Sequence, residues 1–534
     1  MQQKITLKIL PSEAGNEIII LENISKISGK KLSEISGYQL LKKSIDARGK
    51  IAWVNLAVNI FINEPFEKRK LLQFTFENVK DSAKKVVIIG GGPAGIFAAL
   101  LLLEKGIKPI IVERGKEVRA RRRDLAVLNK EGIINPESNY CFGEGGAGTY
   151  SDGKLYTRST KRGDVTRILN LFVHFGADEN ILYNAHPHIG TNKLPAIITA
   201  MRKRILDCGG EFHFEKKVID FTIEKDKIKS VKTSDGDLIN GDSFILATGH
   251  SARDIFTLLH RKKIQIIAKG FALGVRIEHP QAIINSIQYR NDNAQQSFLP
   301  PASYSLVEQI DGRGVFSFCM CPGGIIAPAS TNENELVVNG WSPSKRNNPF
   351  ANSGMVVQVE IEDVIKKYNE GKINQTKSNT CRSLIMMDFQ KEIEQKAFEM
   401  GGGKFVAPAQ RMVDYTENKF SSTLPKCSYL PGIKGVELKE VLPRFINDRL
   451  KSALRSFSKK IPARNKHSGY FTNEAVLVAT ESRTSSPVRI PRDEFYLHHP
   501  QIKNLFPCGE GAGYAGGIVS AAMDGERVAL ACCS

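Results

Sequence analysis

The spacing of apolar residues changes near position 80, and this change predicts a domain boundary. Before it, alternating apolar and polar residues over 5–10 and 51–62 predict strands, an apolar run covers 17–21, and the spacing over 32–47 predicts a helix. We therefore expect a small α/β domain over residues 1–80. Its last part is charged and is interpreted as the link to the next domain.

From residue 85 the pattern is a buried strand, a glycine loop, an apolar helix and a second strand. This order is typical of a βαβ unit in a parallel sheet. Between residues 270 and 466, strand patterns and helix patterns are mixed, and they predict an inserted α+β domain. The expected strands lie at 271–277, 314–320 and 335–340, and the expected helices at 356–370 and 383–399.

Nucleotide-binding signals return after the insertion. The predicted organisation is therefore a Rossmann-like α/β domain in two parts, 81–269 and 467–534, interrupted by an α+β substrate domain over 270–466. A chain of 534 residues is long enough for these domains and the small N-terminal α/β domain to have cores of their own.

The first nucleotide-binding signal is Gly90-x-Gly92-x-x-Gly95, directly after the apolar run 86–89. The first glycine permits a tight turn, the second allows a pyrophosphate to approach the backbone, and the third allows helix and strand to pack closely. Pro93 and Ala94 begin the helix, whose N-terminal N–H groups favour phosphate. The signal predicts a dinucleotide.

An acidic residue completes this first signal. Glu113 ends the second strand, eighteen residues after Gly95, where a carboxylate is suited to accept ribose hydroxyls, and Arg114 follows it.

Two later segments indicate which dinucleotide is bound. A buried strand runs into Ala247-Thr248-Gly249, and Gly509-Glu510 precedes Gly516-Gly517-Ile518 and a helix of small residues. With the first motif, they resemble the FAD-binding fold of the glutathione-reductase-like flavoproteins. Glu510 stands where that family usually has Asp. The resemblance implies FAD, with the loop around Gly148 beside the flavin ring and the final helix directed at N1 and the C2 carbonyl.

Three further segments, at 140–155, 401–411 and 481–487, extend the similarity over nearly the whole chain. They resemble the poorly characterised bacterial FAD-dependent dehydrogenases, which implies a redox role without naming a substrate. The predicted cofactor-binding residues are Gly90, Gly92, Pro93, Ala94, Gly95, Glu113, Arg114, Gly148, Val218, Ala247, Thr248, Gly249, Gly509, Glu510, Gly516, Gly517 and Ile518.

Catalytic residues are harder to identify from the sequence. We consider Lys154, which follows the flavin loop, Arg276 at the end of a strand, and Arg483. A lysine could bind an anionic substrate or lie near N5, and arginine suits a carboxylate or phosphate. The alternative for each is a surface or structural charge. Arg346 is considered in the same way, and Cys319-x-Cys321 is interpreted as a pair of strand residues.

The charge balance favours anionic ligands. Seventy-five Lys and Arg residues exceed 56 Asp and Glu, which gives a formal charge of +19. The basic segment 444–466 is predicted to be an amphipathic helix with a solvated polar face, and nucleic-acid or membrane contact is the alternative. The nine cysteines lack metal-ligand or C-x-x-C spacing, so we expect a reducing compartment and no structural metal. The first residues lack a secretory pattern, so we expect a cytoplasmic protein without membrane partners.

These observations predict an FAD-dependent oxidoreductase that exchanges a hydride equivalent with a small, anionic substrate through flavin N5. NAD(P)H is considered as a transient electron donor, without a second nucleotide-binding domain. Two alternatives stay open. One is a flavoenzyme of tRNA modification, and the other is a non-catalytic FAD-binding electron carrier.

Overall fold

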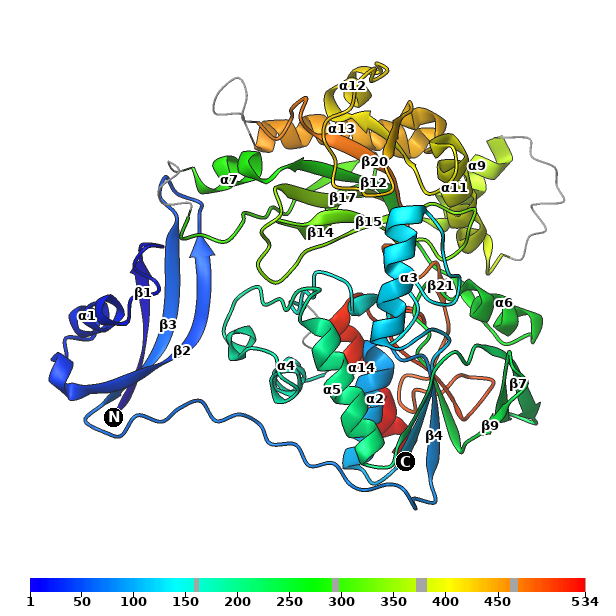
Figure 1. The fold of residues 1–534 in the computed structure, drawn as a ribbon, viewed down its shortest axis with the longest axis horizontal. Coiled ribbons are helices and arrows are strands. Elements are labelled where there is room, and N and C mark those ends of the chain that lie inside the picture. Colours follow the sequence, from blue (N-terminus) through cyan, green and yellow to red (C-terminus); the bar gives the residue numbers. More distant parts are fainter. Residues whose placement is uncertain (158–162, 291–296, 371–381, 462–468, 534) are drawn as a thin grey trace.

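The computed structural model describes residues 1–157, 163–290, 297–370, 382–461 and 469–533, which form three units, each built on a sheet (Figure 1). Cys381 and the last residues of the expected basic segment, 462–466, lie outside these ranges. No helix within the described part of the chain is both long and apolar enough to cross a membrane.

The N-terminal unit is a three-stranded antiparallel sheet covered by one helix. The strand order is β1-β3-β2, and Ile20 and Ile24 of the helix are buried against the sheet. The elements are β1 (Gln2–Ile9), α1 (Glu17–Ser28), β2 (Ile35–Asp46) and β3 (Trp53–Ile62). A segment without helix or strand, 63–84, then leads to the second unit (Figure 1).

The helix expected over 32–47 is wrong, because β2 occupies most of that stretch. Its pairing with β3 shifts register twice, between Ile35 and Gly37 and between Leu40 and Lys42. Each bulge adds one residue and breaks the strict alternation of a strand. The apolar residues consequently acquire a spacing that resembles a helix, and pairing to the buried β3 decides the conformation.

The second unit contains a five-stranded parallel sheet in the order β22-β10-β4-β5-β6. Four of the five residues of β4 are buried, as expected for a strand that is covered on both faces. Its strands are β4 (Lys85–Ile89), β5 (Lys108–Val112), β6 (Glu211–His213), β10 (Ser243–Leu246) and β22 (Leu505–Pro507).

Helices cover one face of this sheet, and a small antiparallel sheet with one helix covers the other (Figure 1). On the first face lie α2 (Pro93–Glu104), α5 (Leu194–Asp207) and α14 (Ile518–Cys533), and on the second lie β7 (Val218–Glu224), β8 (Lys227–Thr233), β9 (Leu238–Asn240) and α6 (Arg253–Arg261). The remaining elements are α3 (Val118–Glu131), α4 (Val165–His174), β11 (Ile267–Ala268) and β21 (Val488–Arg489).

The third unit is built on a seven-stranded sheet in the order β13-β14-β17-β12-β20-β18-β19, antiparallel except between β18 and β19. Its strands are β12 (Phe271–Pro280), β13 (Val307–Ile310), β14 (Arg313–Cys321), β17 (Phe350–Val359), β18 (Ala407–Arg411), β19 (Ile433–Gly435) and β20 (Val476–Glu481), beside the hairpin β15 (Ile325–Pro328) and β16 (Val338–Trp341). Its helices are α7 (Gln281–Tyr289), α9 (Ile361–Glu370), α11 (Ile385–Gly401), α12 (Met412–Glu417) and α13 (Arg444–Lys460).

Two expectations for this region need correction. β20 lies beyond the expected boundary at residue 466, yet it pairs with β12 and β18 inside the seven-stranded sheet. The helix expected over 356–370 begins only at Ile361, because Val356 to Val359 complete β17 in the buried middle of the sheet. The helix expected over 383–399 is observed as α11, and α13 buries its apolar face as its pattern predicts.

Candidate functional site

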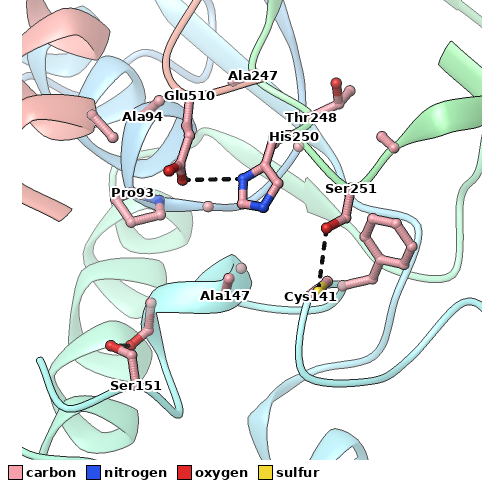
Figure 2. Close-up of a pocket in the computed structure, with 18 of the residues that line it drawn as sticks. Pro93, Ala94, Cys141, Ala147, Ser151, Ala247, Thr248, His250, Ser251 and Glu510 are labelled. Atoms are coloured by element: carbon pink, nitrogen blue, oxygen red, sulfur yellow. Dashed lines mark hydrogen bonds and ion pairs between the residues drawn. The ribbon is translucent and has the colours of Figure 1, made fainter. Parts of the chain in front are cut away.

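A cavity opens at the carboxyl ends of β4, β5 and β10, where α2 and α14 begin (Figure 2). Most of the predicted cofactor-binding residues line it: Gly90, Gly92, Pro93, Ala94, Glu113, Arg114, Gly148, Val218, Ala247, Thr248, Gly249, Glu510, Gly516, Gly517 and Ile518. Gly95 and Gly509 are not among the lining residues. The fold thus brings together segments that are more than 400 residues apart.

The three glycines of the first motif have different roles. Gly90 has a φ of 111°, and a Cβ there would lie 2.4 Å from the Ala247 carbonyl oxygen, so this turn requires glycine. A Cβ at Gly95 would lie 2.0 Å from the Gly90 carbonyl oxygen. At Gly92 the nearest protein atom would be 3.9 Å away, on Gly146. Because Gly92 lines the cavity, its missing side chain leaves space for a ligand.

Two helices present their N-termini to this cavity. Gly92 is the N-cap of α2, and Gly516 and Gly517 precede the first residue of α14. The helices pack closely, since a Cβ at Gly525 of α14 would lie 2.1 Å from the Ala94 carbonyl oxygen. Helix N-termini carry free N–H groups and partial positive charge, so both favour an anion such as a pyrophosphate.

Glu113 fastens the loops around one end of the cavity. Its Oε2 accepts a hydrogen bond from the Gly91 N–H at 2.7 Å, and its Oε1 accepts from the N–H groups of Gly115 and Gly143, both at 2.9 Å. A carboxylate has about four acceptor positions, so these three bonds leave capacity for a ligand hydroxyl. Glu113 therefore organises the backbone as well as facing the cavity.

Arg114 is fixed beside Glu113. Its guanidinium pairs with Glu137 at 2.6 Å and with Asp254 at 2.9 Å, and it lies 4.1 Å from the centre of the Phe142 ring. Since Arg114 and Phe142 both line the cavity, they form an ordered surface of a paired guanidinium and an aromatic ring at this end.

Sequence reasoning missed His250 and Ser251, which follow the predicted Ala-Thr-Gly turn. His250 Nδ1 lies 3.4 Å from Glu510 Oε2, and the Ser251 hydroxyl donates to the Cys141 sulfur at 3.4 Å (Figure 2). Their position after a turn at the end of a parallel strand is a signal that could have identified them, because ligands bind at that edge of the sheet.

Arg121 was also missed as a supporting residue. It is fully buried and donates to the carbonyl oxygens of Asn139, Tyr140 and Glu144 at 2.8–3.0 Å. This arginine therefore shapes the loop that leads to Gly146 and Gly148. Its spacing to Leu125 and Leu128 on α3 places it on the buried side of that helix, whereas charge alone indicates solvent.

Lys154 enters the cavity beside the third unit. Its ammonium lies 3.4 Å from Asp152 and 3.6 Å from the Cys321 sulfur, and its side chain is 37% exposed. Asp152 also pairs with Arg346 at 2.8 Å. Burial acts to raise the pKa of Asp152, but Lys154 and Arg346 outweigh it and lower that pKa to about 2. Lys154 is thus an ordered cation in the cavity.

Arg276 has a supporting position. It is fully buried, does not line the cavity, and donates to Asn352, Asn339, Glu481 and the Cys319 carbonyl at 2.7–3.3 Å. Its remaining contact is the Cys321 sulfur at 3.5 Å. Because its donors are taken by the protein, Arg276 holds the end of β14 in place. Cys319 and Cys321 at that end both line the cavity.

Arg483 lines the cavity but belongs to a buried ionic network. It pairs with Glu394 at 3.0 Å and with Glu335 at 3.4 Å. Arg253, on α6 of the second unit, pairs with the same two carboxylates at 2.9 Å. The network therefore joins the parallel-sheet unit to the inserted unit beside the cavity.

Comparisons with known proteins agree with this site. Residues 83–130 match the family described as an FAD binding domain, and residues 270–484 match an FAD-dependent protein, C-terminal domain-like family. Residues 1–61 match a domain of unknown function. An uncharacterised protein of Clostridium beijerinckii is 38% identical over 529 residues, which cover 96% of this chain and 95% of that protein.

The chain belongs to the family of that Clostridium protein. The matched FAD-dependent domains show that FAD is the cofactor of this chain, and its fold is a mixed α/β fold with a parallel sheet in the FAD-binding domain. The resemblance to glutathione-reductase-like flavoproteins stays a prediction.

Solved structures show weaker likeness. Glycine oxidase from Bacillus cereus is 12% identical, with 84% of this chain and 94% of that chain covered and a TM-score of 0.29. L-Proline dehydrogenase from P. horikoshii is 14% identical, with 84% and 92% covered and a TM-score of 0.32.

The residues of the cavity fit FAD. The two helix N-termini and Gly92 suit its pyrophosphate, and the Glu113 carboxylate suits the hydroxyls of its adenosine ribose. Gly148, Gly516 and Gly517, beside which the flavin ring is expected, line the same cavity as Lys154 and the end of β14.

Proposed function

We propose that this protein is an FAD-dependent oxidoreductase whose small, anionic substrate binds between the FAD-binding unit and the end of β14. The observation that carries this proposal is the composition of the cavity wall. Besides the FAD-binding motifs, it contains Phe318, Cys319, Cys321, Asn339 and Gly340 of the inserted unit. A site that only holds the cofactor does not need this second wall from the inserted unit. A site where a substrate reacts with the cofactor does need it.

When bound, FAD supplies hydride exchange at N5, and the protein supplies position and electrostatics. The N-terminus of α14 stabilises negative charge on the side of the cavity that it faces, because a helix N-terminus carries roughly half a positive charge. Lys154 places a second positive charge in the cavity. Both charges favour a substrate with a carboxylate or phosphate.

We assign substrate binding to Lys154, among the three residues considered for catalysis. Its ammonium is in the cavity, and its contacts with Asp152 and Cys321 restrict its position. Arg276 acts as a positioning residue behind β14. Arg483 touches the cavity, but its charge is neutralised by Glu335 and Glu394, so we assign it to joining the two units.

The proposal also covers the electron donor and the cellular location of the protein. NAD(P)H can act as a transient donor, and a cytoplasmic location matches the cysteines, because the eight in the described part of the chain are free thiols. Two alternatives are separated by experiment. Salt-sensitive tRNA binding would favour an RNA-modifying flavoenzyme. A bound flavin that no donor and acceptor pair turns over would favour an electron carrier.

The test is an anaerobic screen of metabolites for bleaching of the bound flavin. We expect carboxylate- or phosphate-bearing compounds to bleach it and their neutral amides or dephosphorylated forms to be slower. Lys154→Met should slow bleaching by the anionic compound by about 10–100-fold, corresponding to about 1.4–2.8 kcal/mol. Lys193→Met changes an exposed lysine outside the cavity and should bleach like the unchanged protein. Equal rates for anionic and neutral compounds in all three proteins would contradict the proposed substrate class.

A further inference from the structure

A second cavity, of about 1290 Å³, lies where the three units meet. β2 and the following turn of the N-terminal unit form one side, the segment 184–188 forms another, and the end of α7 with nearby parts of the inserted unit closes it. Its described lining contains no Asp or Glu. It contains five cationic residues: Lys43, Arg48, Arg290, Arg346 and Lys460.

Backbone hydrogen bonds attach the N-terminal unit to the second unit at the wall of this cavity. The Lys43 N–H donates to the Tyr183 carbonyl at 2.8 Å, and the Ala185 N–H donates to the Lys43 carbonyl at 2.9 Å. These two bonds add the segment 183–185 to the edge of β2 as a short parallel bridge. They fix the backbone of Lys43 at the cavity wall. Because side chains alternate along a strand, the Lys43 side chain lies on the opposite face of β2 from the exposed Lys42 side chain.

The cations of the lining have different partners. Arg48 pairs with Asp46 at 2.8 Å, and Lys460 pairs with Glu308 at 2.9 Å, but neither carboxylate lines the cavity. Lys43 has no carboxylate within ion-pair distance among the residues that the structure describes. Among the described residues, the cavity wall therefore carries positive charge from several elements and no carboxylate.

Arg346 gives the second, independent observation. Its Nη2 binds Asp152 at 2.8 Å, while its Nε is buried and has no hydrogen-bond partner among the described residues. A buried guanidinium N–H without an acceptor is costly. Because this Nε is buried, a ligand acceptor reaches it only when the Arg346 side chain turns toward the cavity that it lines.

The second cavity also adjoins the flavin cavity. Asp152 lines the flavin cavity and Arg346 lines the second one, so their ion pair lies in the wall between them. Tyr156 of the first cavity and His186 of the second are in edge contact, with ring centres 5.1 Å apart. A ligand that binds Arg346 would thus be separated from the flavin cavity by the single residue Asp152.

We propose that this second cavity binds a small molecule with two or more anionic groups, and that the N-terminal unit completes the site through Lys43. The cations come from four separate segments, so one anionic group cannot contact all of them. A ligand with several carboxylates or phosphates can bridge them, and a recess closed by three units suits a small molecule. The inference does not depend on the redox reaction.

The experiment is calorimetric titration of the FAD-loaded protein at fixed ionic strength, near 0.1 M. Tripolyphosphate represents phosphate ligands, citrate represents carboxylate ligands, and acetate is the monoanionic control. We expect one site per chain for at least one polyanion and no comparable binding of acetate. Whichever polyanion binds more tightly identifies the ligand chemistry.

Charge-reversal variants locate the site. Lys43→Glu should weaken polyanion binding at least 10-fold. Lys42→Glu changes the neighbouring, exposed lysine on the other face of β2, and should weaken binding less than threefold, because solvent and salt screen a charge that faces away from the cavity. Equal effects of the two substitutions would overturn the proposal, since binding would then reflect overall charge.

A second pair of variants lies outside the N-terminal unit, so that its effects do not depend on the folding of that unit. Lys460→Gln, on α13, should weaken binding about threefold or more, whereas Lys459→Gln, whose side chain is exposed outside the cavity, should leave it unchanged. The proposal would be overturned if neither polyanion binds. It would also be overturned if the protein binds only tRNA and none of the four substitutions changes that affinity. Because flavin reduction is not measured, neither result bears on the proposed oxidoreductase activity.

Discussion

The two walls of the flavin cavity are built by different means. The FAD-binding wall uses backbone groups: glycines that leave space, two helix N-termini, and loops fastened by Glu113. The opposite wall uses side chains from distant strands, held by Arg276 and by the network around Arg483. A backbone site is encoded in short motifs, because glycine spacing and a strand–helix order suffice. A side-chain site depends on which strands become neighbours.

The largest expected effect tests whether Arg276 supports the second wall. Arg276→Met leaves the Glu481 carboxylate buried without its partner, which is 3.0 Å away in the ion pair. We expect a loss of about 3–5 kcal/mol of unfolding free energy, as for other broken buried ion pairs. Chemical denaturation of the FAD-loaded protein measures it. Adding Glu481→Leu should restore part of the loss, and a stable single variant that is merely inactive would instead favour a catalytic role.

The next effect separates two glycines of the FAD-binding wall. Gly95→Val places a Cβ 2.0 Å from the Gly90 carbonyl oxygen, so helix and strand must separate. We expect a destabilisation of at least about 3 kcal/mol, near the upper end for overpacking. Thermal unfolding of the apoprotein measures it.

Gly92→Val is the matched variant, since its side chain would meet the cofactor rather than the protein. We expect folded, colourless protein, detected by circular dichroism together with the absence of flavin absorbance. Yellow Gly92→Val protein would show that the pyrophosphate does not approach this turn.

The two regions should also respond oppositely to pH. In the inserted unit, burial acts to raise the pKa of Glu394, but Arg253 and Arg483 lower it to about 2. Its stabilising contribution is present above the ordinary value of 4.5 and is lost as the pH falls towards 2. On α14, burial raises the pKa of Glu526 to about 7 against the opposing effect of Arg167. That contribution is present below 4.5 and is lost as the pH rises through 7.

Each contribution is on the order of 3 kcal/mol, from about 1.4 kcal/mol per unit of pKa. Melting temperatures between pH 3 and pH 8 measure both. Glu526→Gln should flatten the dependence of melting temperature on pH between pH 4.5 and 7. Glu394→Gln should flatten its acidic part. Profiles unchanged by either substitution would refute the assignment.

The smallest expected effect concerns Glu113. Glu113→Gln replaces one acceptor oxygen by an N–H₂ group, so at least one backbone N–H in the loop loses its partner. We expect a loss of about 1–2 kcal/mol, or roughly tenfold weaker FAD binding, because the neutral amide keeps the shape. Titration of apoprotein with FAD, followed by flavin fluorescence, measures the change. Affinity equal to that of the unchanged protein would show that the loops hold without this carboxylate.

The sequence by itself determined the FAD-binding half of the molecule. The run before Gly90, the three glycines and the acid at Glu113 are local, and their physical roles follow from a strand, a turn and a helix N-terminus. These motifs predicted a dinucleotide and the interruption of the parallel sheet by a second domain. The resemblance to known flavoproteins implied FAD, and the comparisons confirm that cofactor.

Only the tertiary structure decided the rest. Pairing with β3 made residues 35–46 a strand, pairing with β12 and β18 placed β20 in the inserted sheet, and the buried contacts of Arg276 made it a support. The same is true of the second cavity, whose cations come from segments more than 400 residues apart. Such features arise when distant strands and loops become neighbours, and the free energy of those contacts exceeds the local preferences that a sequence pattern reports.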